Sequence, residues 1–228
     1  MTDLLAAYLA TDWPTVRPIV VRLLNSKHEV ARRSGAVLAC LAALQQSEAA
    51  DMLERCLIHD DPVVRESAAR VLAANLTGAR YTGMCADGLR RLFDDESAEV
   101  RRAAVGAFWH MRRHELGEFA DLARVLMVTR AFADGRSQLM HALEESTAPE
   151  VAGLTMDLAE RMVESLPGLG DIRTAAAGDA KELTELLIRV LGDVEEDPAL
   201  RARALDALDR LVAAGAWGVV DAMDPAER

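Results

Sequence analysis

The chain has 228 residues, of which 51% are hydrophobic, 28% charged and only 4% aromatic, and its formal net charge is −11. This balance excludes an intrinsically disordered chain and, because no run of about 18 apolar residues occurs, a membrane-spanning helix. The 41 alanines and 31 leucines favour helices and suit a β-sandwich poorly, since β-sandwiches need β-branched and aromatic residues.

The negative charge is concentrated towards the C-terminus. Residues 1–140 hold 18 basic and 18 acidic residues, whereas residues 141–228 hold 8 and 19. The C-terminal part is therefore expected to repel nucleic acids and anionic lipids. The first residues, MTDLLAAYLATDW, carry Asp3 where a secretory signal carries Lys or Arg, so we predict a cytoplasmic protein.

A short motif recurs along the chain at a spacing near 34 residues. It reads KHEVA at 27–31, DPVVR at 61–65, SAEVR at 97–101 and DPALR at 197–201. The second copy begins 34 residues after the first, and the third begins 36 residues after the second. The fourth copy begins 136 residues after the second, which is four times 34. Such a period is typical of helical-repeat architectures.

Each copy of the motif predicts the start of a helix. Asp or Ser is suited to cap the helix, Pro fits its first turn, and an acid complements the positive helix end. Short amphipathic segments, 48–60 and 83–95, precede two of the copies, so the predicted unit is helix, tight turn, helix. The apolar positions expected to pack after the motif are Val64, Ala68, Val71, Leu72, Val100, Ala104, Ala107, Phe108, Leu200, Ala204, Leu208 and Leu211.

The unit D-P-x-V-R-x-x-A-x-x-A/V-L resembles the HEAT repeat, and the resemblance covers most of the chain. It implies an all-α fold, an α-α superhelix (HEAT-like solenoid) of about six helical hairpins, in which turn Asp and following Arg residues form a ladder between repeats. The implied ladder residues are Asp61, Arg65, Asp95, Arg101, Asp197 and Arg201. Ala31 replaces the Arg in the first copy, so the ladder is expected to break there unless Arg32 substitutes.

We predict a single solenoid domain over 1–228. Its regular repeats span about 14–114, its degenerate repeats 115–192, and its terminal repeat and cap 193–228. The helices expected in the degenerate part are 115–128, 137–145, 149–165 and 181–194. LPGLGD at 166–171 interrupts the pattern, 171–180 is expected to extend a helix or form an ordered turn, and Trp217 is expected to pack as a cap.

A weaker resemblance concerns the C-terminal part, from GDIRTAAAGDA to GAWGVVDAM. It is similar to the C-terminal HEAT regions of large bacterial multidomain ATPases, some of them of the antiviral-defence kind. The nucleotide-binding motif GxxxxGK[ST] is absent from this sequence. The resemblance therefore implies a helical arm without its motor.

The segment FWHMRRH at 108–114 is the most basic and aromatic part of any expected helix. Together with a preceding arginine it predicts a contact patch for a protein partner, made of Arg102, Trp109, Arg112 and Arg113. Phe108 aligns with Leu72 in the repeat and is expected in the core. Bacterial alkylpurine DNA glycosylases, which are helical-repeat proteins of similar length, provide the alternative hypothesis of a nucleic-acid enzyme. They use an acid near aromatic side chains, but Arg113 stands where an acid would share the helix face of Trp109, and the pI is near 5.0.

Metal and redox chemistry are weakly indicated. Two His-Glu pairs, 28–29 and 114–115, resemble half of the four pairs with which HEAT-type deoxyhypusine hydroxylases bind iron, and two pairs cannot complete that site. His110 and His114 have metal-pair spacing, but two arginines lie between them. Cys40, Cys56 and Cys85 lack CxxC spacing and are expected to be buried free thiols.

We therefore predict no metal, no cofactor and no catalytic residue, and interpret the chain as a non-catalytic scaffold that binds a protein or a neighbouring domain of a longer polypeptide. The glycosylase is the principal alternative, and a metal-dependent or bilin-lyase-like HEAT enzyme is a third possibility.

Overall fold

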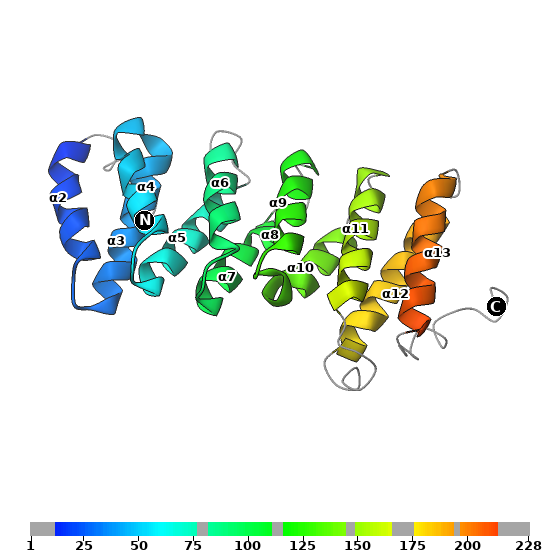
Figure 1. The fold of residues 1–228 in the computed structure, drawn as a ribbon. Helices are drawn as coiled ribbons and strands as arrows, with labels where there is room; N and C mark the ends of the chain where they lie inside the picture. Colours follow the sequence, from blue (N-terminus) through cyan, green and yellow to red (C-terminus); the bar gives the residue numbers. More distant parts are fainter. Residues whose placement is uncertain are drawn as a thin grey trace. The chain divides into compact units, whose positions relative to one another are not determined.

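The computed structural model describes residues 12–76, 82–110, 116–144, 149–165, 176–193 and 197–213. Within these ranges every regular element is a helix, so the predicted all-α class is confirmed. The helices, labelled as in Figure 1, are α2 (Trp13–Leu24), α3 (Glu29–Gln45), the 3-10 helix η1 (Ser47–Ala49), α4 (Ala50–Leu57), α5 (Pro62–Asn75), α6 (Thr82–Leu92), α7 (Ala98–Val105), α8 (Ala107–His110), α9 (Leu116–Val128), α10 (Phe132–Glu144), α11 (Pro149–Ser165), α12 (Ala176–Asp193) and α13 (Pro198–Ala213). No helix in the described ranges is long and apolar enough to cross a membrane.

The predicted helix boundaries differ from the observed ones mainly where small residues weaken the apolar pattern. The expected helix over 149–165 coincides with α11, and α9 starts one residue later than expected. In contrast, α10 begins at Phe132 rather than at residue 137, because Gly135 interrupts the pattern without interrupting the helix. The helix α12 begins at Ala176, so the described part of 171–180 extends a helix. The predicted cap, Trp217, lies outside the described residues.

Contacts divide the chain into two compact units, Met1–Gly135 and Arg136–Arg228. The division falls within α10, so the first unit holds the beginning of this helix and the second unit holds the rest. We refer to them as the N-terminal and the C-terminal unit and describe each by itself. The extent of a single solenoid domain over 1–228 stays a prediction.

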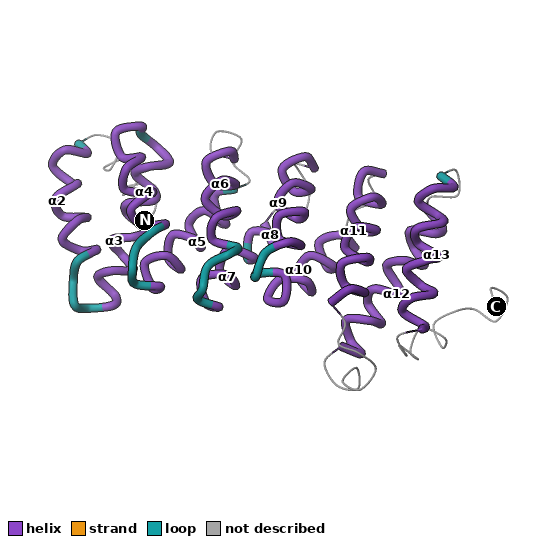
Figure 2. Tube along the Cα trace, in the orientation of Figure 1, coloured by secondary structure: helices purple, strands orange, loops and turns teal. Residues whose placement is uncertain are grey.

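The helices of the N-terminal unit form two layers. The second helices of successive hairpins, α3, α5 and α7, pack on one another, and α4, α6 and α9 contact one another in the other layer (Figure 1). Within each hairpin the two helices also pack together, as in α2 with α3 and α5 with α4. The short loops that join the helices of each hairpin lie along one edge of this unit (Figure 2). This edge is where residues of the repeated motif are found.

The close packing of these layers depends on small side chains. Of the twelve apolar positions predicted after the motif, eleven are buried, and only Leu200 is partly exposed. Gly35 marks the tightest approach, since a Cβ there would lie 2.8 Å from the backbone N of Leu24 and 2.9 Å from Cβ of Leu23. Helices α2 and α3 can therefore approach this closely only because position 35 has no side chain.

An aromatic cluster fills the core of the N-terminal unit beside α8. Phe93 and Phe108 are fully buried and stack with ring centroids 6.1 Å apart, and Phe119 meets Phe108 edge to face at 5.6 Å. Such pairs add about 0.5–1.5 kcal/mol beyond the area they bury. The prediction that Phe108 belongs to the core is confirmed.

In the C-terminal unit α11, α12 and α13 pack on one another. Their contacts are apolar, with Leu158, Leu187 and Leu211 among the buried side chains. One arginine joins two of the helices: Arg203 of α13 donates from Nε to Glu160 at 2.9 Å and from Nη2 to Asp157 at 3.0 Å, both on α11.

Candidate functional site

Arginines of the N-terminal unit pair with aspartates of the following hairpin. The Nε of Arg32 donates to Asp61. Arg65 binds both carboxylate oxygens of Asp95, at 2.7 and 2.9 Å, and Arg101 Nε donates to Asp134 at 2.7 Å. We call these three pairs, Arg32–Asp61, Arg65–Asp95 and Arg101–Asp134, the Arg–Asp ladder.

Each arginine of the ladder also holds the turn that precedes its own helix. Nη1 of Arg32 donates to the carbonyl of Ser26 at 2.9 Å, and Nη1 of Arg101 donates to that of Asp95 at 2.8 Å. Nη1 of Arg65 donates to the carbonyl of His59 at 2.5 Å. In all three cases the accepting residue lies six positions before the arginine. A single guanidinium therefore fixes the turn before its own helix and binds an aspartate of the next hairpin.

Two aspartates of the ladder also accept from backbone N–H groups. Asp61 Oδ1 caps α5 by accepting from the N–H of Val63 at 2.9 Å, and Asp95 Oδ1 accepts from the N–H of Ser97, in the turn before α7, at 2.8 Å. Burial alone would raise the pKa of the Asp61 carboxyl, but the N–H of Val63 and the guanidinium of Arg32 more than offset this effect and lower the pKa. Asp61 is therefore held as a carboxylate.

Four of the residues implied by the resemblance belong to the Arg–Asp ladder, namely Asp61, Arg65, Asp95 and Arg101. Two further residues, Arg32 and Asp134, complete its three pairs. Arg32 takes the place of the arginine missing at Ala31, which resolves the alternative in its favour. Asp134, which pairs with Arg101, was not among the implied residues. In the sequence Asp134 is marked only by its position 33 residues after Arg101, and it belongs to no copy of the motif.

Asp197 and Arg201 form a different arrangement in the C-terminal unit. The Asp197 carboxylate caps α13 by accepting from the N–H groups of Ala199 and Leu200, at 3.0 and 3.1 Å. Arg201 is exposed. Its backbone N–H donates to the carbonyl of Asp197 at 3.0 Å, which is a helical hydrogen bond at the start of α13.

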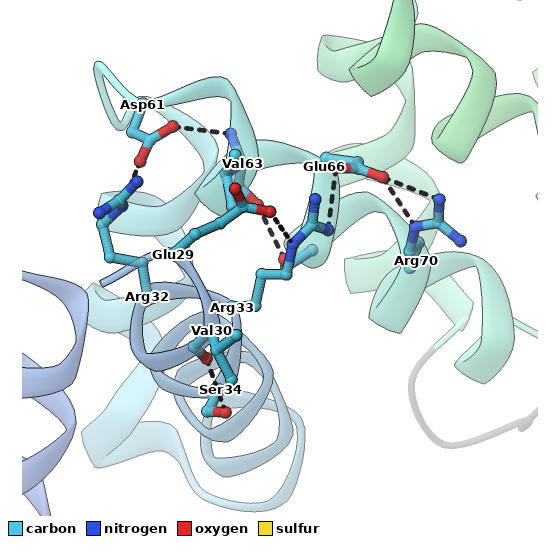
Figure 3. A network of polar contacts seen from close by, with 10 residues as sticks. Glu29, Val30, Arg32, Arg33, Ser34, Asp61, Val63, Glu66 and Arg70 are labelled. Carbon is cyan, nitrogen blue, oxygen red and sulfur yellow. Dashed lines mark hydrogen bonds and ion pairs between the residues drawn. The ribbon is translucent and has the colours of Figure 1, made fainter. Parts of the chain in front are cut away.

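A second row of charges runs beside the ladder across α3 and α5 (Figure 3). Glu66, with a side chain only 10% exposed, accepts from Arg33 at 3.0 Å and from Arg70 at 2.8 Å. Arg33 also binds Glu29 at 2.9 Å. A nearly buried carboxylate thus holds two guanidiniums from neighbouring helices, and the side chain of Arg70 remains 67% exposed.

A groove of about 400 Å³ lies between α5 and α7, next to this row. Its charged lining consists of Glu66 and Arg70 from α5 and Glu99 and Arg102 from α7. The remaining lining consists of the small residues Ala73, Ala103 and Gly106.

Two of the four residues predicted for a contact patch are among the described residues, and one of them lines this groove. Arg102 lines the groove, its side chain is 63% exposed, and its Nε lies 3.5 Å from Asp134. Trp109 follows Gly106 by three residues and is 48% exposed, although its neighbour Phe108 is fully buried. Arg112 and Arg113 lie outside the described residues.

Two of the described histidines, His28 and His59, lie just before helices. His28 precedes α3 without a side-chain capping bond and is exposed. His59 accepts on Nδ1 from the N–H of Asp61 at 3.0 Å, which fixes the turn before α5. Among the described side chains no group of three or more His, Cys, Asp and Glu is arranged to hold a metal ion. His114 lies outside the described residues.

The three cysteines are free and fully buried, as expected from their apolar neighbours. They come from α3, α4 and α6. A hydrogen bond with the Cys56 thiol, together with burial, raises the pKa of Cys40 well above its ordinary value, and burial raises that of Cys85 to about 12. Cys40 and Cys85 are therefore protonated at neutral pH and unsuited to act as nucleophiles.

No protein-family model, curated protein or solved structure matches this chain.

Proposed function

We propose that this chain is a HEAT-like solenoid of about six hairpins that serves as a non-catalytic binding or scaffold module for a protein partner. The two-layered packing of hairpins in the N-terminal unit supports this proposal, because repeats that bury their flanks against one another offer long surfaces to a partner. The Arg–Asp ladder supports it as well, since each rung links one hairpin to the next.

The observation that carries the proposal is the exposure of Trp109. Nearly half of this large aromatic side chain faces solvent, whereas the adjacent Phe108 is completely buried. Tryptophan and arginine are the residue types most enriched at the energetic centres of protein interfaces, and the exposed Arg102 belongs to the same patch. An exposed indole and an exposed guanidinium fit protein recognition better than catalysis.

The weaker resemblance extends the proposal to a biological setting. The module is then the helical arm of a larger bacterial ATPase or defence-type assembly, and its partner is another protein or a neighbouring domain of a longer polypeptide. The cytoplasm remains the expected compartment.

Capture of partners on the immobilised chain tests the proposal. Trp109→Ala and Arg102→Ala are each expected to reduce the captured amount about tenfold, the size of effect typical of an interface centre. Arg112→Ala and Arg113→Ala extend the same test to the other two patch residues. The circular dichroism melting curve is expected to stay unchanged, since Trp109 and Arg102 are exposed.

Val128→Ala is the matched control, because Val128 is 78% exposed and lies on α9, in the other layer. It is expected to leave capture unchanged. Equal capture by wild type, Trp109→Ala and Arg102→Ala would remove the patch from the proposal.

A further inference from the structure

The groove between α5 and α7 has an electrostatic asymmetry that its formal charges do not reveal. Two acidic and two basic side chains line it, so the count is neutral. Their accessibility is unequal: Glu66 is 10% exposed, whereas Arg70 and Arg102 are 67% and 63% exposed and Glu99 is exposed as well. A molecule entering the groove therefore meets guanidiniums before it meets the Glu66 carboxylate.

The buried carboxylates are also already used. Glu66 accepts from both Arg33 and Arg70. Asp134, which lies 3.5 Å from Arg102, binds Arg101 more closely at 2.7 Å and is 14% exposed. A guanidinium has five N–H donors, and the bonds of Arg70 to Glu66 employ only two of its nitrogens. Arg70 and Arg102 thus keep donors for a further anionic group.

The remaining lining suits a polypeptide backbone. Ala73, Ala103 and Gly106 leave space between the two helices, so that an extended chain can approach closely. Trp109 follows Gly106 by three residues in the sequence, and its half-exposed indole offers an apolar surface on which a side chain of the bound segment can pack.

We infer that this groove binds an acidic, extended protein segment, with two of its carboxylates held by Arg70 and Arg102 and a flanking apolar side chain packed on Trp109. The inference rests on the proposed binding function and names the chemistry of its partner. The two oxygens of a carboxylate match the guanidinium fork, which donates to both of them in a bidentate manner.

A nucleic acid fits the groove less well. Binding to a phosphate backbone requires a continuous basic surface, because its affinity comes from the neutralisation of many phosphates. Here Glu99, which accepts from the Ser97 hydroxyl at 2.9 Å, and Glu66 line the same groove as the two arginines. Two guanidiniums accompanied by two carboxylates favour a few discrete carboxylates over a polyanion.

The test uses the full chain and a dye-labelled peptide of about ten residues with alternating Glu and Ala, measured by fluorescence anisotropy at low salt. The same peptide with Gln in place of Glu is the uncharged control and is expected not to bind. Arg70→Gln and Arg102→Gln are each expected to weaken binding about tenfold. Glu99→Gln is expected to tighten it about threefold, because it removes a like charge from the groove.

Arg124→Gln is the matched control for charge, since Arg124 is 56% exposed on α9, away from the groove lining. It is expected to bind the peptide like wild type. Equal affinity of wild type, Arg102→Gln and Glu99→Gln would overturn the inference, because the acidic peptide would then bind elsewhere. Tighter binding of oligothymidylate than of the Glu peptide, with the same dependence on Arg70 and Arg102, would overturn it in favour of a nucleic acid.

Absence of peptide binding at millimolar concentration would also overturn the inference. The partner-capture experiment then tests the proposed function separately. Partner capture that still falls with Trp109→Ala would keep the binding module and discard its acidic ligand. Capture that is insensitive to Trp109→Ala, combined with peptide binding that depends on Arg102, would keep the groove and move the larger interface elsewhere.

Discussion

Arg65 on α5 binds both carboxylate oxygens of Asp95, which lies in the turn of the next hairpin, at 2.7 and 2.9 Å. The two side chains are 9% and 8% exposed, so the pair is nearly excluded from water. Nη1 of the same guanidinium donates to the carbonyls of His59 and Asp60 in the turn before α5. The pair therefore connects two turns through one buried charge on each side, and the loss of Arg65 leaves the buried Asp95 carboxylate without this counterion.

Arg65→Ala is expected to destabilise the protein by about 3–5 kcal/mol, the usual cost of leaving one partner of a buried ion pair alone. Urea denaturation followed by circular dichroism measures the change. Arg70→Ala is the matched control, because its side chain is 67% exposed and its ion pair is expected to contribute less than about 1 kcal/mol. A loss for Arg65→Ala no larger than that for Arg70→Ala would contradict this account of the ladder.

The sequence was informative about the ladder only where the motif was intact. DPVVR at 61–65 pointed to Asp61 and Arg65, because the cap and the arginine keep their spacing. Asp134 was missed because it lies within α10, where a helix start carries no copy of the motif. Which carboxylate a guanidinium reaches is decided by the packing of hairpins far apart in sequence, such as Arg101 and Asp134. Local spacing does not contain that information.

Gly35→Ala is expected to destabilise the protein by about 1–3 kcal/mol, as overpacking does in a close-packed core. The added Cβ would lie 2.8 Å from the backbone N of Leu24 and 2.9 Å from Cβ of Leu23, and the backbone atom cannot turn aside as a side-chain end can. Thermal denaturation provides the measurement.

The control for this substitution is Gly83→Ala on α6, where a Cβ meets nothing within 4 Å. Alanine is the better helix former by up to about 1 kcal/mol, so this variant is expected to be neutral or more stable. A loss of stability for Gly35→Ala with no loss for Gly83→Ala would establish that the close contact of α2 with α3 is the reason why position 35 needs a glycine. Equal effects would contradict it.

Acid is expected to destabilise the fold through Asp61 and Glu160. The carboxyl of Asp61 has a pKa below its ordinary value of 3.8, because the N–H of Val63 and the Arg32 guanidinium outweigh the effect of burial. The carboxyl of Glu160 has a pKa below 4.5, chiefly because Arg203 donates to it. Each group has the lower pKa in the folded state, so the unfolded chain takes up the proton first as the pH falls.

The stabilisation from these carboxylates is therefore complete above about pH 5 and is lost progressively as the pH falls through the folded pKa values. Urea denaturation at a series of pH values between about 3 and 7 measures the loss. In Asp61→Asn the free energy of unfolding is expected to fall less steeply below pH 5 than in wild type. An unchanged slope in that variant would show that Asp61 does not contribute to the acid sensitivity.

The candidate contact surface was predictable in part. Phe108 and Trp109 are adjacent aromatic residues, and the helical period assigned Phe108 to the core and left Trp109 for the surface. The groove itself could not be predicted from the sequence, because its walls come from two helices and its accessible charge depends on the burial of Glu66 beneath Arg33 and Arg70. The formal charges of the lining sum to zero, and the structure adds that Glu66 is nearly buried whereas Arg70, Arg102 and Glu99 are exposed.

The three thiols offer a direct measure of how the N-terminal unit opens. Cys40, Cys56 and Cys85 are fully buried, and burial raises the pKa of Cys85 to about 12, so little Cys85 thiolate is present at neutral pH. The folded protein is expected to react with none of its three thiols on mixing with an aromatic disulfide reagent, and with all three after unfolding in urea. Arg65→Ala is expected to raise the labelling rate of the folded protein by roughly two to three orders of magnitude, because labelling then follows the population of the open state. Rapid labelling of even one thiol in the folded wild type would contradict the burial of the three cysteines. Equal labelling rates in wild type and Arg65→Ala would show that the opening that exposes the thiols does not depend on the Arg–Asp ladder.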